Sequence, residues 1–269
     1  MGRGSLECMP VNPSQPQASS NEATSATTPD VRRRPVRMVF TSRAGGVSSS
    51  PYGSFNLGTH VGDNPEDVAA NRARLTRVLD LPDIVYMEQL HTNTVTVIDG
   101  PQDGPVEATD ALVTTTPNLG LAVLVADCVP VLLSDHAAGV VAAAHAGRMG
   151  ARNGIVRRTV STMVELGATP ANIQVLLGPA ASGRHYEVPA EMAADVEAHL
   201  PGSRTKTTKG TPGIDVRAGL VRQLLSLGVT HIEADPRCTI EDEAFFSYRR
   251  EGTTGRQAGV IWLNQPKES

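Results

Sequence analysis

The sequence predicts an α+β fold of mixed β-sheets layered with helices, and two observations predict it. Short aliphatic runs of strand length follow one another through the middle of the chain, with helical periodicity mainly before and after them. Such runs, without steady β-α alternation, favour separate sheet and helix layers over a doubly wound nucleotide-binding fold. Aromatic residues make up only 3% of the chain, so aliphatic side chains must build the core.

The elements can be assigned in chain order. Val36–Phe40 is the first expected strand, and a helix begins after Asn64, a capping residue followed by Pro65 and two acidic residues. The next strands are largely apolar, which suits burial on both faces. They span 84–87, 95–98, 111–114, 121–125, 129–133 and 140–144. Helices are expected over 153–166, 189–199 and 215–227, with further strands at 173–177 and 260–263.

Composition bounds the domain organisation and the partners. Residues 1–35 are rich in Ser, Thr, Pro, Asn and Gln, and we expect a disordered tail because such a segment buries too little apolar surface to offset its ordering entropy. Residues 36–265 are expected to form a single catalytic domain. The net charge of −4 divides into +2 for residues 1–37 and −6 for the remainder. An acidic body with few aromatic residues argues against a nucleic-acid partner.

The compartment follows from cysteine usage and hydropathy. The three cysteines are scattered and resemble no disulfide framework, which indicates a reducing compartment. No stretch has the pattern of a signal peptide or a membrane span. We therefore expect a cytoplasmic protein with no membrane partner.

Three side chains at the ends of apolar runs could form a metal site. His91 precedes one run, Cys128 stands between two of them, and His145 ends the run at 140–144. Two imidazoles and a thiolate with an open position make the ligand set of a catalytic zinc. Each residue alone is more often part of a core, because a thiol in an apolar run usually packs as a small hydrophobe. Their separations of 37 and 17 residues match no zinc finger.

Asp127 and the histidine count refine this hypothesis. A carboxylate between apolar flanks is costly to bury unpaired, so Asp127 indicates a functional strand end and could orient a ligand imidazole. Copper is the alternative metal, because two His, one Cys and a nearby Met are also the blue-copper set. A multicopper oxidase needs paired imidazoles, and the seven histidines include no His-X-His pair. Zn²⁺ is therefore the expected metal and Cu²⁺ is disfavoured.

A glycine-rich turn predicts an anion site. Arg43 offers a guanidinium, and Gly45 and Gly46 offer backbone N–H groups that can form a nest. An ordinary turn with an exposed arginine explains these residues equally well. Residues 245–250 and Gly255-Arg256 could add anion contacts and an apolar wall, or could be core aromatics with surface arginines.

Short motifs extend along most of the chain. They are TSRAGGV at 41–47, FNLG at 55–58, QLH at 89–91, TDALV at 109–113, ADCVP at 126–130, HAG at 145–147, GP at 178–179, YEV at 186–188 and FSYRR at 246–250. In this order they resemble the YfiH family, whose members have been labelled laccase-type polyphenol oxidases, purine nucleoside phosphorylases and peptidoglycan editing factors. The resemblance runs from about Val36 to Leu263.

The resemblance implies a fold, a metal and an activity. The fold is that of the cysteine hydrolase superfamily which includes the cytotoxic necrotizing factor catalytic domain. The metal is zinc on His91, Cys128 and His145. The activity is phosphorolysis of adenosine, inosine and methylthioadenosine, with adenosine deamination, so the expected partners are a purine nucleoside and phosphate. The expected catalytic residues are His91, Cys128, Asp127 and His145, and the expected substrate or phosphate contacts are Arg43, Gly45, Gly46, Asn56 and Glu187.

The chain departs from the family pattern at two places, and other functions stay open. Arg148 and Met149 stand where the family usually has Trp-Arg, and Arg184 and His185 stand where cysteines are often found. One alternative is a metal-free cysteine hydrolase that cleaves an amide in a peptidoglycan precursor, with Cys128 as nucleophile. A ligand-binding protein without activity is another. A copper-dependent polyphenol oxidase is disfavoured.

Overall fold

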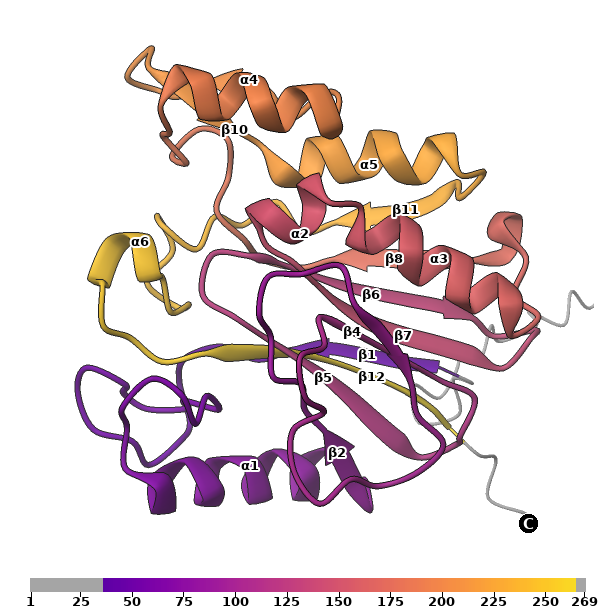
Figure 1. The fold of residues 1–269 in the computed structure, drawn as a ribbon. Coiled ribbons are helices and arrows are strands. Elements are labelled where there is room, and N and C mark those ends of the chain that lie inside the picture. Colours follow the sequence, from indigo (N-terminus) through magenta and orange to yellow (C-terminus); the bar gives the residue numbers. More distant parts are fainter. Residues whose placement is uncertain (1–35, 265–269) are drawn as a thin grey trace, which may run out of the picture.

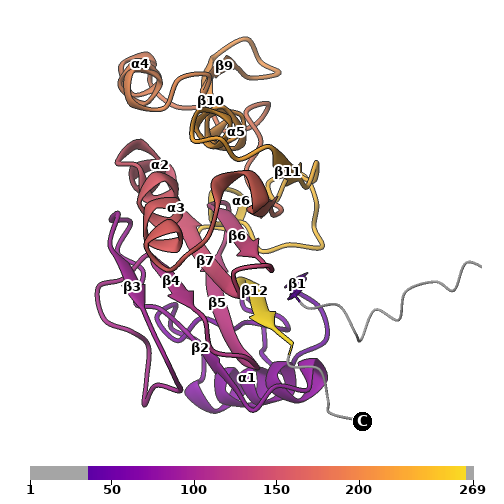
Figure 2. The same cartoon turned by 90° about the vertical axis from the view of Figure 1, so that its right-hand side faces the viewer.

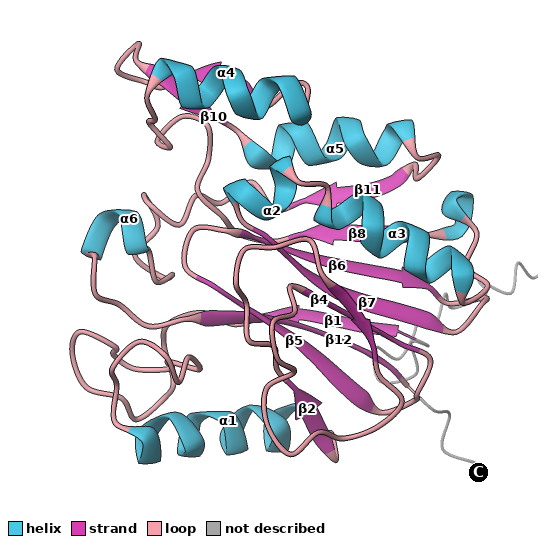
Figure 3. Cartoon of the chain, viewed as in Figure 1, coloured by secondary structure: helices cyan, strands magenta, loops and turns pink. Residues whose placement is uncertain are grey.

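The computed structural model describes residues 36–264, so the expected tail at 1–35 lies outside the described residues, as does residue 265. Two β-sheets stack face to face, and helices cover their outer faces, which confirms the predicted α+β class (Figures 1 and 2). Figure 3 shows the same separation of sheets and helices by secondary structure.

Each sheet combines segments that are distant in sequence. The small sheet has the order β1-β12-β5-β2, formed by Val36–Phe40 (β1), Gln257–Leu263 (β12), Leu119–Val125 (β5) and Asp83–Val85 (β2). The large sheet has the order β11-β8-β6-β7-β4-β3, formed by His231–Ala234 (β11), Gln174–Leu177 (β8), Val129–Asp135 (β6), Val140–Ala146 (β7), Ala111–Thr114 (β4) and Val95–Val97 (β3). Both sheets contain parallel and antiparallel pairs.

The helices lie outside the two sheets. They are Pro65–Leu79 (α1), Arg148–Arg152 (α2), Ile155–Glu165 (α3), Ala190–His199 (α4), Val216–Ser226 (α5) and Tyr248–Glu251 (α6), with a 3₁₀ turn at Pro170–Asn172 (η2). Arg204–Lys206 (β9) and Pro212–Ile214 (β10) form a separate two-stranded sheet near α4. Within the described residues, no helix is both long enough and apolar enough to cross a bilayer.

Alternating side chains divide the core into three layers. Leu121 of β5 and Leu132 of β6 lie in the layer between the two sheets. Their neighbours point the other way, because successive side chains of a strand leave opposite faces of the sheet. Ala122 packs toward α1, and Val131 packs toward the helices on the large sheet. Burial on both faces accounts for the continuous apolar runs of the central strands.

The structure differs from the expected elements where they are short or interrupted. The helix expected over 153–166 is α3, which begins after Gly154, a residue whose φ of 81° lies in the left-handed region. The short helix α2, which precedes it, was not expected. Strands β9, β10 and β11 and helix α6 were not expected, because they span only three or four residues and show no clear periodicity. The Asn64 cap is confirmed, since its side chain accepts a hydrogen bond from the Glu66 N–H at 3.0 Å.

Candidate metal centre and substrate pocket

Strand register brings the site residues together. In the antiparallel β6·β7 pair, Pro130 lies opposite His145, so Cys128, just before β6, lies beside the end of β7. On the other side of β7, Ala111 of β4 lies opposite Ala144, which places Asp110 next to His145. The His145 N–H donates to the Asp110 carbonyl at 2.7 Å.

Two connections between the sheets supply the other candidate ligands. Cys128 lies in the turn from β5 of the small sheet to β6 of the large sheet, and His91 lies in the connection from β2 to β3. Gln89 fastens the latter to β5: its side-chain amide donates to the Leu124 carbonyl at 2.7 Å and its oxygen accepts from the Leu124 N–H at 2.8 Å. The QLH motif therefore positions His91 against the small sheet.

The three candidate ligands converge into a group that we call the trio. His91, Cys128 and His145 each place one donor atom within 4.8 Å of the other two, and the two imidazole centroids are 4.6 Å apart. His145 is buried, Cys128 is half-buried and His91 is exposed. The trio is thus buried at His145 and open to solvent at His91, and a catalytic metal site needs such an accessible side.

Asp110 orients both histidines. Its Oδ1 lies 2.9 Å from Nδ1 of His145, and its carboxylate accepts the backbone N–H groups of Leu90, His91 and Thr92 at 2.7 to 3.2 Å. The Thr92 hydroxyl donates to Oδ2 at 2.7 Å. Three consecutive N–H groups thus form a nest around the carboxylate, which explains how His91 is held at a φ of 59°, a conformation unusual for a non-glycine residue.

The electrostatics of this pair favour a cation. Burial alone would raise the pKa of Asp110, but hydrogen bonds from His145 and Thr92 outweigh it and hold that pKa below its usual value. Burial likewise opposes protonation of His145, but the charge of Cys128 and the hydrogen bond to Asp110 raise its pKa to about 9 in the metal-free protein. Negative groups that attract a proton to this imidazole also attract a metal ion, which takes the place of the proton on coordination.

The space at Gly147 supports metal binding. A Cβ at Gly147 would lie 2.5 Å from Nδ1 of His91 and 3.1 Å from Sγ of Cys128, so only glycine leaves the donor atoms accessible. With Nδ1 of His145 engaged by Asp110, Nε2 is left to act as a ligand. Two imidazoles and a thiolate around a side-chain-free cradle fit Zn²⁺.

Asp127 has a different role from the one expected of it. The carboxylate that contacts a ligand imidazole is that of Asp110, whereas Asp127 accepts the Thr239 hydroxyl at 2.7 Å and the Arg249 N–H at 2.6 Å. Its carbonyl accepts the Ala181 N–H at 2.9 Å, and its φ of 92° is left-handed. Asp127 thus joins the Cys128 turn to the segments around Thr239 and α6. Both aspartates precede apolar strands, and only the register distinguishes them.

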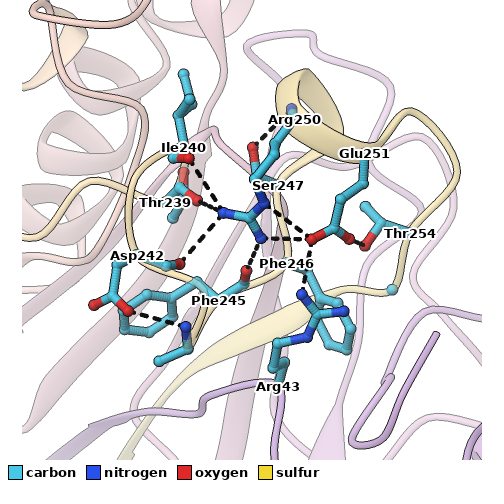
Figure 4. Close-up of polar contacts among 12 residues, drawn as sticks. Arg43, Thr239, Ile240, Asp242, Phe245, Phe246, Ser247, Arg250, Glu251 and Thr254 are labelled. Carbon is cyan, nitrogen blue, oxygen red and sulfur yellow. Dashed lines mark hydrogen bonds and ion pairs between the residues drawn. The ribbon is translucent and has the colours of Figure 1, made fainter. Parts of the chain in front are cut away.

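The expected anion turn is occupied by contacts within the protein. The N–H groups of Gly45 and Gly46 both donate to the Ser54 hydroxyl at 3.1 Å. Arg43 donates to Glu251 at 2.7 Å and lies over the Phe246 ring, where Figure 4 shows its guanidinium directed at the Glu251 carboxylate. Among residues 36–264, no hydrogen bond or ion pair joins this turn to the trio.

Arg250 completes the network around Arg43. It donates to the same Glu251 oxygen at 2.5 Å and to the carbonyls of Thr239 and Phe245 at 2.6 and 2.7 Å (Figure 4). The pKa of Glu251 is lowered because hydrogen bonds from Thr254, Arg250 and Arg43 outweigh the opposing effect of burial. In this conformation both guanidinium groups hold the C-terminal loops together.

Of the other two expected contacts, Asn56 has a structural role and Glu187 is exposed. Asn56 is fully buried, and its Oδ1 accepts the N–H groups of Gly58 and Arg256 at 2.9 and 2.8 Å. It therefore holds the backbone of Arg256 in place. Glu187 is exposed, and its carbonyl accepts from Nη1 of Arg249 at 3.1 Å.

Three arginines near the trio form a group that we call the cationic rim: Arg148, Arg249 and Arg256. Burial lowers the pKa of Arg256, while the charges of Cys128 and Asp127 oppose this, so its guanidinium is electrostatically coupled to both. Arg148 and Arg256 both lower the pKa of His91, after burial and the larger effect of His145. The sequence signal for Arg256 was only its place beside a glycine, and Arg148 was noted only as a departure from the family.

Tyr186 interacts electrostatically with both the trio and the rim. Burial raises its pKa, and the charge of Cys128 raises it further, whereas Arg148 and Arg249 lower it. The Arg249 guanidinium lies 5.0 Å from the Tyr186 ring centroid. A half-buried ring, three guanidinium groups and three candidate metal ligands are thus close neighbours in the fold.

Comparisons with known proteins show which proteins this chain is similar to. The family model described as multi-copper polyphenol oxidoreductase laccase matches residues 37–264. A purine nucleoside phosphorylase of Corynebacterium glutamicum is 70% identical over 244 residues, 89% of this chain and 98% of the relative. One from Mycobacterium tuberculosis H37Rv is 55% identical over 230 residues, 85% and 92% of the two chains.

Solved structures share the fold. YlmD from Geobacillus stearothermophilus matches with a TM-score of 0.80 at 33% identity, covering 88% of this chain and 94% of its own. The YfiH protein of Bacillus licheniformis matches with a TM-score of 0.79 at 31% identity, covering 85% and 93%. With motifs, fold and relatives in agreement over nearly the whole described chain, this protein belongs to the YfiH family.

Proposed function

We propose that this protein is a zinc-dependent purine nucleoside phosphorylase that cleaves adenosine, inosine and methylthioadenosine with phosphate. Relatives at 70% and 55% identity carry the name purine nucleoside phosphorylase. The observation that carries the proposal is the position of the trio beside the cationic rim. A metal site next to clustered guanidinium groups suits a reaction between a neutral nucleoside and a phosphate dianion.

The trio would hold the metal in one orientation. Asp110 keeps His145 in the tautomer whose Nε2 faces away from it, and the nest at 90–92 fixes His91. Bound Zn²⁺ would supply a fixed Lewis acid next to the reacting groups. The open His91 side gives the substrate access.

The cationic rim would bind and orient phosphate. Arg256 is half-buried, so its charge acts through a medium of lower dielectric than water. As an oxygen of hydrogen phosphate forms its bond to the anomeric carbon of the ribose, the bond from that carbon to the purine nitrogen breaks. The base leaves with the proton that the hydrogen phosphate gives up. Fixed guanidinium groups stabilise the charge on the phosphate throughout this exchange. Tyr186 offers an aromatic face beside the same groups.

We propose adenosine deamination as a second activity of the same pocket. It requires a group that transfers protons to and from the purine. Asp127 is engaged by Thr239 and Arg249, so the exposed Glu187 is the better-placed of the two expected carboxylates to exchange protons with solvent. Release of ammonia from adenosine without phosphate tests it, and Glu187→Gln should reduce ammonia release more than phosphorolysis.

The nucleoside proposal is tested with protein purified without chelator. Zinc and copper are measured by elemental analysis, and the protein is incubated with inosine, adenosine or methylthioadenosine with and without phosphate. We expect phosphate-dependent release of the base, with ribose 1-phosphate from adenosine and inosine and methylthioribose 1-phosphate from methylthioadenosine, and we expect this activity to be lost together with zinc in Cys128→Ala. No turnover of any of the three nucleosides by zinc-loaded protein would refute the proposal, and activity that follows copper content would replace zinc in it.

One observation favours a second candidate function. Cys128, His145 and Asp110 also form the arrangement of a cysteine nucleophile, a base and an orienting carboxylate, since His145 interacts with Cys128 and its Nδ1 contacts Asp110. A metal-free hydrolase of this kind would cleave an amide, such as one in a peptidoglycan precursor. It predicts an apoprotein that hydrolyses such an amide and is inactivated by thiol alkylation. Loss of all activity on zinc removal, with recovery on reloading, contradicts it.

A further inference from the structure

A second group of metal-binding side chains lies outside the trio. His185, Cys238 and Glu241 each place one donor atom within 4.8 Å of the other two. His185 belongs to the loop between β8 and α4, and the other two follow β11. The two loops run side by side, joined by a bridge between Ala180 and Cys238 and by a 3.2 Å hydrogen bond from the Thr239 N–H to the Ala180 carbonyl.

The distances in this group suit one small cation. Nδ1 of His185 lies 3.2 Å from Oε2 of Glu241 and 3.8 Å from Sγ of Cys238. In a tetrahedral zinc site with bonds of about 2.0 Å to nitrogen or oxygen and about 2.3 Å to sulfur, neighbouring ligand atoms stand roughly 3.3 to 3.6 Å apart. Nδ1 carries at most one proton and can donate to only one of the two acceptors, whereas a shared cation satisfies all three groups.

The surroundings of the sulfur and the carboxylate support a metal ligand set. Cys238 is only 5% exposed, and the Ser182 N–H points at its Sγ at 3.4 Å, a donor that stabilises a thiolate. The Ser182 hydroxyl lies 3.4 Å from Nδ1 of His185. The Glu241 side chain is 52% exposed, so an ion can enter from solvent.

We infer that His185, Cys238 and Glu241 form a second metal site, the clamp site, which takes Zn²⁺. Nitrogen, sulfur and oxygen donors at tetrahedral spacing match this borderline ion, whereas Mg²⁺ and Ca²⁺ require oxygen donors.

An ion at the clamp site would restrain two loops that contact the proposed substrate pocket. Thr239 follows Cys238, and its hydroxyl donates to the carboxylate of Asp127, next to Cys128. Tyr186 follows His185 and carries the Arg249 guanidinium on its ring. An ion that joins the two loops therefore restrains both the turn that bears Cys128 and the aromatic face beside the rim. The site is structural, since none of its ligands belongs to the trio.

Zinc stoichiometry tests the clamp site. The full chain is stripped with chelator and equilibrated by dialysis against buffered Zn²⁺ under reducing conditions, and bound zinc is measured by mass spectrometry. We expect two zinc ions per wild-type chain, one in Cys238→Ser, one in Cys128→Ala and none in the double variant, which still contains Cys8. His231→Ala removes an exposed imidazole elsewhere and is expected to keep both ions.

A milder variant and a stability readout complete the test. Glu241→Gln changes an exposed side chain and leaves the fold intact, and it should weaken the second zinc about tenfold or more while sparing the first. Zinc should raise the melting temperature of Cys128→Ala, and this rise should vanish in Cys128→Ala/Cys238→Ser. A single zinc per wild-type chain, or a second zinc that binds unchanged in both Cys238→Ser and Glu241→Gln, would overturn the inference. Neither result bears on phosphorolysis, which is tested through Cys128.

Discussion

Replacing Asp110 with asparagine probes the metal centre most directly. The wild-type carboxylate accepts five hydrogen bonds: Oδ1 takes those from the His91 N–H and His145, and Oδ2 takes those from Leu90 and from the N–H and hydroxyl of Thr92. An amide has only one oxygen, so its NH₂ group must face two or more donors in either orientation. The orientation that keeps the Oδ2 contacts turns NH₂ toward His145, whose Nδ1 must then accept a hydrogen bond while its Nε2 carries the ring proton.

The expected effects are large and separable. Removing one partner of a buried charged pair costs about 3 to 5 kcal/mol of unfolding free energy. Because the asparagine keeps one oxygen that accepts hydrogen bonds, we expect Asp110→Asn to cost about 3 kcal/mol, near the lower end of that range. Because Nε2 then carries a proton, zinc affinity should fall about 10- to 100-fold. Urea denaturation of the metal-free protein measures the first effect, and competition with a chromophoric chelator measures the second.

Asp103→Asn is the matched control, because Asp103 is exposed in a loop. It should leave both quantities at their wild-type values. If Asp110→Asn keeps wild-type zinc affinity and an unfolding free energy within about 0.5 kcal/mol of wild type, Asp110 does not orient His145 as argued.

Three further predictions follow from the same region. Gly147→Ala should abolish zinc binding and turnover, since its Cβ would lie 2.5 Å from Nδ1 of His91, whereas Gly100→Ala, with no atom within 4 Å of the new Cβ, should retain both; a zinc-replete Gly147→Ala would contradict the cradle. Arg256→Met should raise KM for phosphate about 10- to 100-fold, from the loss of a charged hydrogen bond of roughly 1.5 to 3 kcal/mol, and should change KM for inosine less; equal effects on both would remove Arg256 from the phosphate site. Metal-free protein should lose on the order of 3 kcal/mol of unfolding free energy as pH rises from 6.5 to about 9. Folding raises the pKa of His145 from 6.5 to about 9, so protonation of His145 stabilises the fold fully below pH 6.5 and ceases to do so above pH 9. Thermal melts of the apoprotein that do not depend on pH would disprove this.

Much of the fold follows from patterns that act locally. Strand-length apolar runs predict the buried strands because those strands are covered on both faces, and the Asn64-Pro65 pair predicts the start of α1 because capping is a local interaction. The three candidate ligands could be named because imidazole and thiolate are the preferred zinc donors. Their convergence depended on register, which no single segment encodes.

The same limit explains the misassigned carboxylate and turn. Asp110 and Asp127 look alike in sequence, each preceding an apolar strand, and only the pairing of β4 with β7 assigns His145 to Asp110. The N–H groups of the Gly45-Gly46 turn accommodate an acceptor as predicted, but that acceptor is Ser54, eight residues from Gly46. Clusters such as the cationic rim combine residues about 100 apart, so they become visible only in three dimensions.

The two connections that carry His91 and Cys128 have a consequence for how sequence changes far from the pocket act. Both connections run from the small sheet to the large sheet. The relative placement of the two sheets therefore sets the distances between these two donors and His145. The interior layer that contains Leu121 and Leu132 is therefore a spacer for the metal centre. A substitution that changes side-chain volume in that layer would lower zinc affinity and turnover even if every pocket residue is unchanged. Relatives can therefore differ in activity through substitutions in the interior alone.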